Sequence, residues 1–392
     1  GNTTDTLMRI GFDGKRAVRN MTGLGNYSRL VVESLAKRFP ESEFDVFTPD
    51  MRENPRLETL LQLPNVKMRL PDTKGLFGKG ALWRTFGISS QIRKEGIDLF
   101  HGLSNELPLN IKAAGIPSVV TIHDVIYRRL PDCYSLPDRI IYNFKYGISC
   151  RIADRIIAVS QRTKDDITEI YGIDPEKIDV VYQGCAEIFK HTATRNALAE
   201  ARRKYRLPER YIVQVGTIER RKNLELTVRA LSALPADVHL VAIGRDRGYL
   251  ARVMDIARRN GTAQRIHVLD SVSFAELPAI CQQAAAAAYP SFYEGFGIPV
   301  IEALESGIPA VAAKGSCLEE AGGEAAFYVD PRSPRQMAEA LKAAIADGPA
   351  TVSRIALGKR HASRFNNSDI PARLAEVYSR TIEGFRRQRP EP

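Results

Sequence analysis

An α/β fold with two doubly wound, Rossmann-like domains is predicted by three features of the sequence. The chain has 392 residues, of which 44% are hydrophobic, and this is enough for two domains that each bury a core. Apolar runs of strand length alternate with segments of helical periodicity, which is typical of a parallel sheet covered on both faces. A charged stretch without strand character interrupts the alternation near 186–208 and is predicted to be a linker between two series.

The first series predicts an N-terminal domain over residues 8–186. It opens with MRIGFDG (8–14), which is followed by a helical segment, LGNYSRLVVESLAKRF. The later strand-like runs are EFDVFTP, IDLFHG, PSVVTIHD, ADRIIAVSQ and IDVVYQG.

The second series predicts a C-terminal domain over residues 206–370. Its strand-like runs are YIVQVG, VHLVAIG, RIHVLD, AAAAAYPS, IPAVAA and AAFYVD. Ligands of doubly wound sheets bind beyond the carboxyl ends of the strands. We therefore expect a cleft between the two domains, lined by the loops that follow these runs.

A final helix is predicted over residues 371–387, PARLAEVYSRTIEGFRR. Its apolar residues recur at helical spacing, so one face should be buried. These residues are Leu374, Val377, Tyr378, Ile382 and Phe385.

Composition narrows the classes of protein to consider. The net charge of +10 favours anionic partners. The five cysteines show no metal-binding spacing and favour a reducing, cytoplasmic setting. No run approaches the ~18 apolar residues of a spanning helix, and residues 1–7 lack the features of a signal peptide. We expect no nucleic-acid partner.

An anion-binding turn is predicted in EGFGIPVIE, residues 294–302, directly after a strand-like run. Pro299 suits the first helical position. The backbone N–H groups of Gly295, Phe296, Gly297 and Ile298 would then face a phosphate at a helix N-terminus. A tight strand-to-helix turn without a ligand is the alternative.

Two glutamates flank this turn and indicate a hydroxyl-rich ligand beside the anion. A carboxylate next to a phosphate is repelled unless neutral hydroxyls lie between them. Glu302 could accept hydrogen bonds from a ribose diol, and Glu294 from a sugar. Alternatively, Glu302 only complements a helix N-terminus.

Basic residues follow the first strand of the second series, in TIERRKN. Arg221 and Lys222 could hold a diphosphate and stabilise its charge as it departs. A solvated basic turn is the alternative. In the first series, Gly25 belongs to a glycine-rich segment that could approach a phosphate, and the His123–Asp124 pair ends a strand at the same edge.

These motifs, in this order, resemble the family 4 glycosyltransferases of the GT-B fold over nearly the whole chain. They are TGLGNYSR, TIHD, VSQRTKDDI, VGTIERRKN, PSFYEGFGIPVIEALESGIPAVAA and GSCLEEAGGEAAFYVDP. The resemblance implies a retaining hexosyltransferase whose N-terminal half binds the acceptor and whose C-terminal half binds a nucleotide sugar. It also implies that the C-terminal helix packs back on the N-terminal half.

The resemblance also implies roles for individual residues. Arg221, Lys222 and the 295–298 backbone would bind the donor diphosphate, with Glu302 on the ribose. Glu294 and His123 would contact the transferred sugar. Glu320 matches a further acidic position of the family, whereas Thr217 stands where many members have arginine and Glu319 where proline is common.

Similarity to bacterial polysaccharide and O-antigen mannosyltransferases favours GDP-mannose as donor and cell-envelope polysaccharide synthesis as the process. A UDP-sugar, carrying glucose or N-acetylglucosamine, is the alternative donor. A non-catalytic sugar-nucleotide sensor, an epimerase and a phosphorylase remain alternative functions. A dinucleotide oxidoreductase is disfavoured, because no GxGxxG follows the first strand.

Two further expectations concern metals and membranes. The chain contains no Asp-x-Asp pair, so we expect no metal and no other cofactor.

Residues 74–94, KGLFGKGALWRTFGISSQIRK, combine basic residues with Trp83 and other apolar side chains. Such a segment suits the anionic inner face of a membrane, where a lipid-linked saccharide would be the acceptor. A mobile acceptor loop leading into a core helix is the alternative.

Overall fold

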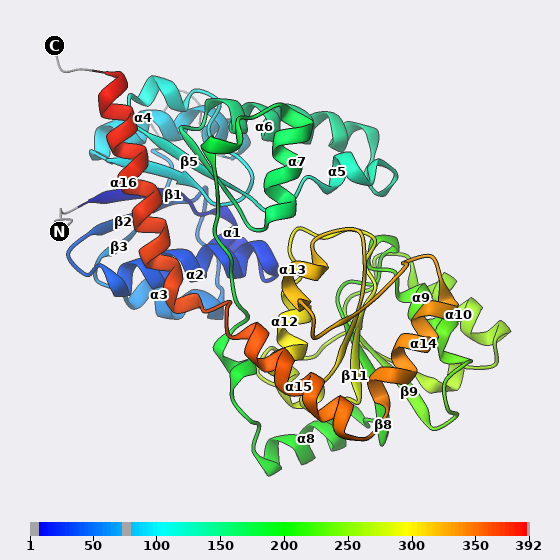
Figure 1. The fold of residues 1–392 in the computed structure, drawn as a ribbon. Coiled ribbons are helices and arrows are strands. Elements are labelled where there is room, and N and C mark those ends of the chain that lie inside the picture. The colour runs from blue at the N-terminus through cyan, green and yellow to red at the C-terminus, as the bar shows by residue number, and fades with distance from the viewer. Residues whose placement is uncertain (1–7, 73–79, 390–392) are drawn as a thin grey trace. The chain divides into compact units, whose positions relative to one another are not determined.

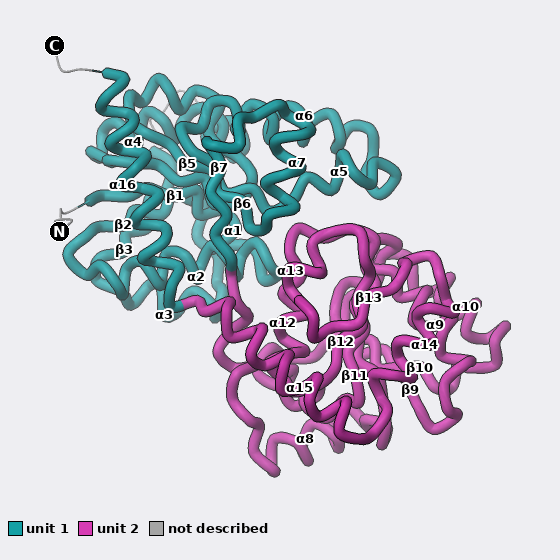
Figure 2. The backbone as a smooth tube through the Cα atoms, viewed as in Figure 1, with its two compact units in different colours: residues 1–182, 368–392 teal, residues 183–367 magenta. Residues whose placement is uncertain are grey.

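Two compact units make up the computed structural model, which describes residues 8–72 and 80–389. Unit 1 contains residues 1–182 and 368–392, and unit 2 contains residues 183–367 (Figure 2). Each unit is a parallel β-sheet with helices packed against it (Figure 1). The predicted fold class is confirmed.

Unit 1 has a seven-stranded sheet within the described residues, in the order β3-β2-β1-β4-β5-β6-β7. Its strands are β1 (Arg9–Asp13), β2 (Glu43–Phe47), β3 (Val66–Arg69), β4 (Leu99–Gly102), β5 (Ser118–Ile122), β6 (Arg155–Ala158) and β7 (Ile178–Val180). Its α-helices are α1 (Lys15–Arg19), α2 (Gly23–Arg38), α3 (Glu58–Gln62), α4 (Ile88–Glu95), α5 (Ile126–Arg129), α6 (Leu136–Ile152), α7 (Gln161–Tyr171) and α16 (Ile370–Gln388). All strand pairs are parallel, with register such as Phe12 opposite Val46.

Unit 2 repeats this arrangement with the order β10-β9-β8-β11-β12-β13. Its strands are β8 (Arg210–Val215), β9 (Val238–Ile243), β10 (Ile266–Leu269), β11 (Ala286–Tyr289), β12 (Ala310–Ala313) and β13 (Phe327–Val329). Its α-helices are α8 (Arg195–Tyr205), α9 (Leu224–Leu231), α10 (Leu250–Arg259), α11 (Leu277–Gln282), α12 (Ile298–Glu305), α13 (Leu318–Gly322), α14 (Pro334–Ile345) and α15 (Pro349–Ala362). As in other doubly wound sheets, the strand order reverses direction beside the first strand, here between β8 and β11.

The C-terminal helix α16 belongs to unit 1 although it follows unit 2 in the sequence (Figures 1 and 2). Leu374, Val377 and Tyr378 lie in one buried cluster with residues of β1 and α2. The Tyr378 hydroxyl lies 2.6 Å from Nδ1 of His101, whose Nε2 lies 2.7 Å from Oγ1 of Thr121. The apolar face predicted from the spacing is therefore buried, and a polar chain connects it to the sheet.

The structure differs from the sequence prediction at two elements. The stretch 186–208 is part of unit 2 and contains α8, which packs on α11. Nε of Arg202 donates to Oε1 of Gln283, the residue directly after α11 (2.8 Å). The stretch is therefore not a linker. Strand β3 was not predicted, because its half-exposed VKMR sequence lacks an apolar run.

In the described part of the segment 74–94, residues 80–94, Leu82 is the one large apolar side chain that is exposed (60%), so these residues present no broad apolar face. Trp83 is 3% exposed and Ile88 is fully buried, and both pack in a core cluster of unit 1. Arg84 forms ion pairs with Asp13 and Glu106. Lys74, Leu76, Phe77 and Lys79 lie outside the described residues. The prediction that Trp83 is an interfacial anchor is wrong, because its ring is needed in the core.

Candidate active site

Two loops of unit 2 meet because the strands before them are neighbours. β8 pairs in parallel with β11, so the loops that follow both strands leave the same edge of the sheet. The first loop contains a 3₁₀ turn, Arg220–Lys222. The second contains Glu294, and the amide of Phe292 in this loop donates to the Arg221 carbonyl oxygen (3.0 Å).

Glu294 joins the two basic residues predicted to bind a diphosphate. Its Oε1 lies 2.7 Å from Nζ of Lys222 and 2.9 Å from Nη1 of Arg221. Lys222 also donates to the Tyr289 hydroxyl (3.0 Å), and Arg221 donates to the Tyr293 carbonyl oxygen (3.1 Å). The structure thus brings Arg221, Lys222 and Glu294 into one cluster, which we call the Glu294 cluster.

All three side chains of the Glu294 cluster are charged at neutral pH. Burial alone would raise the pKa of Glu294, but Lys222 and Arg221 outweigh burial and lower this pKa to about 2. Burial would lower the pKa of Lys222, and the neighbouring Glu294 raises it instead. The three side chains of the cluster together carry a net charge of +1. Glu219, which pairs with Arg221 (3.3 Å), lies beside the cluster and offsets this charge.

The turn after Glu294 leads into α12, but the helix begins at Ile298, so Pro299 is its second residue and not the first as predicted. Gly297 has φ +113°, which favours glycine, and a Cβ atom there would lie 2.6 Å from Cδ2 of Leu318. The Cys317 thiol lies 3.1 Å from the carbonyl oxygen of Glu294 and 2.9 Å from that of Phe296. It can donate to either, so a buried cysteine holds both ends of the turn.

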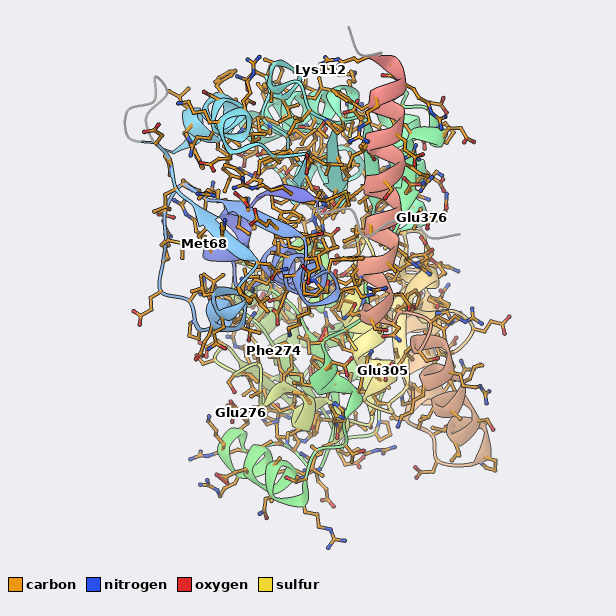
Figure 3. The ribbon with its side chains drawn as sticks, turned by 90° about the vertical axis from the view of Figure 1, so that its left-hand side faces the viewer. Met68, Lys112, Phe274, Glu276, Glu305 and Glu376 are labelled. Atoms are coloured by element: carbon orange, nitrogen blue, oxygen red, sulfur yellow. The ribbon has the colours of Figure 1, made fainter. Side chains whose placement is uncertain are left out.

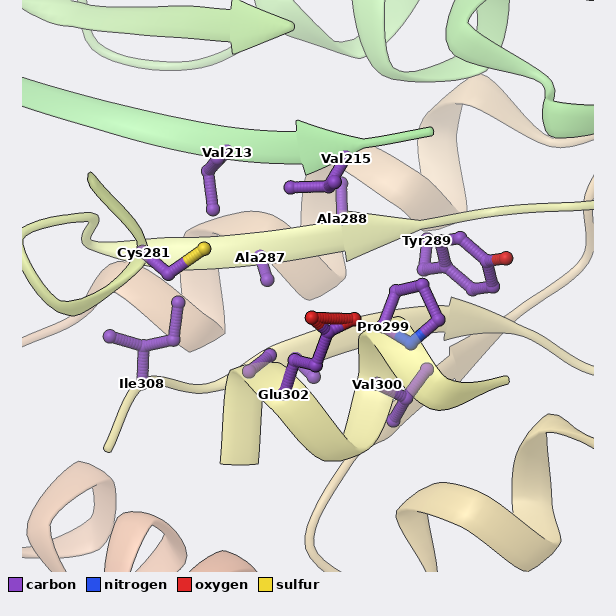
Figure 4. A pocket seen from close by; sticks show the side chains of 12 residues that line it. Val213, Val215, Cys281, Ala287, Ala288, Tyr289, Pro299, Val300, Glu302 and Ile308 are labelled. Atoms are coloured by element: carbon purple, nitrogen blue, oxygen red, sulfur yellow. The ribbon is translucent and has the colours of Figure 1, made fainter. Parts of the chain in front are cut away.

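Glu302 projects from α12 into a small cavity beneath the turn (Figure 4). The cavity has a volume of about 20 Å³ and is lined by side chains of β8 and β11, Tyr289 among them. The Glu302 carboxylate has no hydrogen bond or ion pair within the described residues, and burial raises its pKa to about 7. Tyr289 contacts both this cavity and Lys222, so Glu302 lies next to the Glu294 cluster.

His123 lies in unit 1, directly after β5. Its Nε2 donates to the Leu103 carbonyl oxygen (2.8 Å), and its ring packs edge-on against Tyr27. Burial lowers the pKa of His123 to about 4, against a smaller raising effect of the Leu103 hydrogen bond. His123 is therefore neutral at pH 7. Because Nε2 carries the proton, Nδ1 is left as an acceptor.

Gly25 is part of the first turn of α2 rather than of a loop. Its N–H donates to Oδ1 of Asn20 (2.9 Å), and a Cβ atom at this position would lie 1.9 Å from the Asn20 carbonyl oxygen. This glycine permits close backbone packing, and its amide is already engaged. The expected open glycine turn is therefore a packed helix start.

Sequence reasoning missed three side chains of the site. The Tyr289 hydroxyl accepts a hydrogen bond from Lys222, and the Cys317 thiol contacts carbonyl oxygens of the turn. Asn223, with φ +61°, donates to the carbonyl oxygens of Pro290 and Pro331, each at 2.9 Å. Only Asn223 had a signal, since it directly follows the basic pair in TIERRKN.

The two residues that depart from the family pattern, Thr217 and Glu319, both form hydrogen bonds. Thr217 donates to Glu219 (2.8 Å), and Glu219 in turn pairs with Arg221. Oε1 of Glu319 accepts from the Gly315 amide (3.3 Å). Within the described part of the chain, no three His, Cys, Asp or Glu side chains gather as metal ligands, and no helix is long and apolar enough to cross a bilayer.

Comparison with protein families covers both units. Residues 23–186 match the model "Glycosyltransferase Family 4", and residues 196–361 match "Glycosyl transferases group 1". The chain belongs to the family 4-like glycosyltransferases with the GT-B fold. This glycosyltransferase therefore has the catalytic class that its motifs predict.

Curated relatives of this glycosyltransferase act on different substrates. O-antigen chain mannosyltransferase B of Escherichia coli is 26% identical over 286 residues, covering 71% of this chain and 74% of the relative. D-inositol 3-phosphate glycosyltransferase 1 of Catenulispora acidiphila is 29% identical and covers 92% of both chains.

Solved structures show the same fold for this glycosyltransferase. Anabaena Alr3699/HepE, in complex with UDP and glucose, matches with a TM-score of 0.73 and 21% identity over 95% of this chain and 99% of that one. WaaG, a glycosyltransferase involved in lipopolysaccharide biosynthesis, matches with a TM-score of 0.71 and 16% identity over 95% and 99%.

Proposed function

We propose that this glycosyltransferase retains anomeric configuration and moves a hexose, mannose from GDP-mannose, to a saccharide or lipid-linked saccharide in cell-envelope polysaccharide synthesis. The observation that carries the proposal is the Glu294 cluster at the N-terminal end of α12. The mannosyltransferase name of the Escherichia coli relative supports mannose. Unit 2 would bind the donor and unit 1 the acceptor.

The Glu294 cluster suits the departure of a diphosphate. The bond between the anomeric carbon and the phosphate oxygen breaks, and its electron pair moves to the diphosphate. Arg221, Lys222 and the backbone of Gly295–Ile298 would stabilise this charge. The departing phosphate oxygen accepts the proton of the acceptor hydroxyl, whose oxygen bonds to the anomeric carbon on the same face. Because Arg221 and Lys222 are already in position, they need to move little as the diphosphate departs.

Carboxylates of unit 2 would recognise the uncharged parts of the donor. Glu294 stays ionised and accepts from hydroxyls of the hexose, which lies between it and the phosphates. Glu302 accepts from the ribose diol, for which its unpaired carboxylate is suited. From unit 1, neutral His123 would accept a sugar hydrogen bond at Nδ1, and Gly25 would act by shaping the start of α2.

A UDP-sugar is the second candidate donor, because the similar Anabaena structure holds UDP and glucose. A thermal-shift panel of GDP, UDP, ADP and their sugars tests both donors. A ligand at 100 times its dissociation constant adds ~2.7 kcal/mol to stability. A shift with GDP and not UDP supports GDP-mannose, and the reverse result excludes it.

Donor hydrolysis without acceptor separates turnover from mere sugar-nucleotide sensing. We expect slow release of free hexose from the donor that gives the largest thermal shift. A protein that binds the donor with no hydrolysis, and with no transfer to any acceptor in a saccharide panel, would be a sensor.

Metal-independent turnover is part of the proposal. Arg221 and Lys222 would neutralise the diphosphate in place of a metal cation, and the sequence contains no Asp-x-Asp pair that would hold one. We expect full activity in EDTA. Loss of activity that magnesium or manganese restores would contradict this.

The protein would also contact the cytoplasmic face of an anionic membrane. Exposed apolar side chains of α6 support this contact, in place of the segment 74–94. Leu136, Ile140 and Phe144 recur every four residues along this helix and are 55–61% exposed. Arg151, two turns beyond Phe144, is also exposed and continues the stripe with a cation. We expect sedimentation with anionic but not neutral vesicles, which Ile140→Glu abolishes. Absence of binding at low salt would indicate a soluble acceptor.

A further inference from the structure

A second pocket opens in unit 1, at the carboxyl ends of β1 and β4, and the glycosyltransfer scheme above does not use it. Its volume is about 100 Å³. Asp13 ends β1, Lys15 follows in α1, and Glu106 follows β4. Arg19, Arg84 and Lys145 complete the charged lining. We call this site the Lys15 pocket.

Each carboxylate of the Lys15 pocket already has a basic partner. Arg84 lies between them, with Nη2 2.8 Å from Oδ2 of Asp13 and Nη1 2.9 Å from Oε2 of Glu106. Lys145 lies 3.7 Å from Glu106. Arg19 pairs outside the lining with Asp50 (2.8 Å). These cations and carboxylates therefore satisfy one another.

Lys15 differs from the other three basic residues of the lining, which all form ion pairs. Its ammonium group has no ion pair within residues 8–72 and 80–389. Partial burial, then Arg84, Arg16 and Arg19, lower the pKa of Lys15, and the attraction of nearby Asp13 is weaker than these effects. The Lys15 ammonium therefore lacks an ion-pair partner of its own in this basic lining, and a small anion would supply one.

We propose that the Lys15 pocket binds a phosphate or carboxylate group carried by the acceptor saccharide. The inference rests on the proposed role of unit 1 as the acceptor-binding unit. A small anion would pair with Lys15 at the sheet edge where doubly wound folds bind ligands. The adjoining Asp13–Arg84–Glu106 chain would fix the shape of the pocket and place a hydroxyl of the same saccharide for transfer.

The test titrates the full chain with glucose 6-phosphate, glucuronate, inorganic phosphate and glucose, monitored by calorimetry. We expect both sugar anions and inorganic phosphate to bind and glucose not to bind. Lys15→Met should weaken binding of the sugar anions by about tenfold or more, the effect of losing one charge-assisted hydrogen bond. Lys15→Arg, which keeps the charge, should retain binding.

Two controls separate anion binding in the Lys15 pocket from anion binding elsewhere on the protein. Lys112→Met removes an exposed lysine of unit 1 that does not line the pocket, and should change nothing (Figure 3). Arg221→Ala should leave anion binding by the Lys15 pocket intact, whereas binding lost only in Arg221→Ala would place the anion in unit 2. Lys15→Met should not lower the melting temperature, because it relieves repulsion.

The inference is overturned if Lys15→Met binds sugar anions as the wild type does, if Lys15→Arg loses binding equally, or if Lys15→Met lowers the melting temperature. Failure of the proposed function has a different signature, since no nucleotide or nucleotide sugar would then shift the melting of the wild-type protein.

Discussion

Glu294 pairs with two half-buried cations that would bind the donor diphosphate, so its removal should separate binding from turnover. In Glu294→Gln we expect turnover to fall by roughly 10²–10³-fold, the effect typical of losing one preorganised polar contact. Affinity for a nucleoside diphosphate should not weaken, because the site becomes more positive. Single-turnover kinetics and nucleotide titration measure these quantities.

The same substitution should lower stability by roughly 3 kcal/mol, because Arg221 and Lys222 lose their shared carboxylate. A bound diphosphate should restore part of this stability, so nucleotide shifts the melt of Glu294→Gln more than that of the wild type. Glu305→Gln, on the same stretch of chain, is the control (Figure 3). Near wild-type activity in Glu294→Gln would show that Glu294 does not contact the sugar.

Glu302 should make both stability and donor affinity depend on pH. Its pKa rises from 4.5 in the unfolded chain to about 7 in the fold. Between these values the folded state binds more protons, so stability falls as pH rises through this window, by of order 1–3 kcal/mol. The effect is absent below pH 4.5 and complete above 7.

Nucleotide binding should respond with the opposite sign, because the ribose diol donates to the ionised Glu302. We expect affinity to increase as pH rises toward 7 and a proton to be released on binding, measured by calorimetry in buffers of different ionisation enthalpy. Glu302→Gln should abolish both dependences. Proton release that persists in this variant would assign the titration to another group.

At the level of elements, the turn between β11 and α12 depends on a thiol from the start of α13. Cys317→Val should remove the thiol hydrogen bond to the turn and weaken nucleotide-sugar binding by about tenfold, whereas Cys317→Ser should restore most of it. The readout is the donor dissociation constant. Cys150→Val, a buried cysteine of unit 1, controls for lost packing. Equal donor affinity in Cys317→Val and wild type would contradict the holding role.

At the level of the whole molecule, α16 completes the core of unit 1 after the chain has passed through unit 2. Removing residues 371–392 should lower the melting temperature of unit 1, because Leu374, Val377 and Tyr378 leave its core. Tyr378→Phe should lower stability by about 1 kcal/mol, since His101 loses a buried hydrogen bond. Calorimetry measures both, and an unchanged melt on truncation would show that the helix contributes nothing.

The sequence by itself determined the fold class and pointed to much of the proposed donor site. Strand-length apolar runs and helical spacing are local properties, so they can be read without knowing the neighbours. The motif around Glu294 and the TIERRKN loop likewise consist of contiguous residues whose chemistry is visible in order. Arg221, Lys222 and Glu294 were identified from these patterns alone.

Only the tertiary structure decided which of these residues meet and which are buried. Lys222 and Glu294 are 72 positions apart and touch because β8 lies beside β11. Packing among side chains from distant segments raises the pKa of Glu302 and places Trp83 in the core rather than on a surface. It also leaves the Lys15 ammonium without an ion pair among the described residues. Contacts of this kind depend on strand order and packing, and neither is a property of a short stretch of chain.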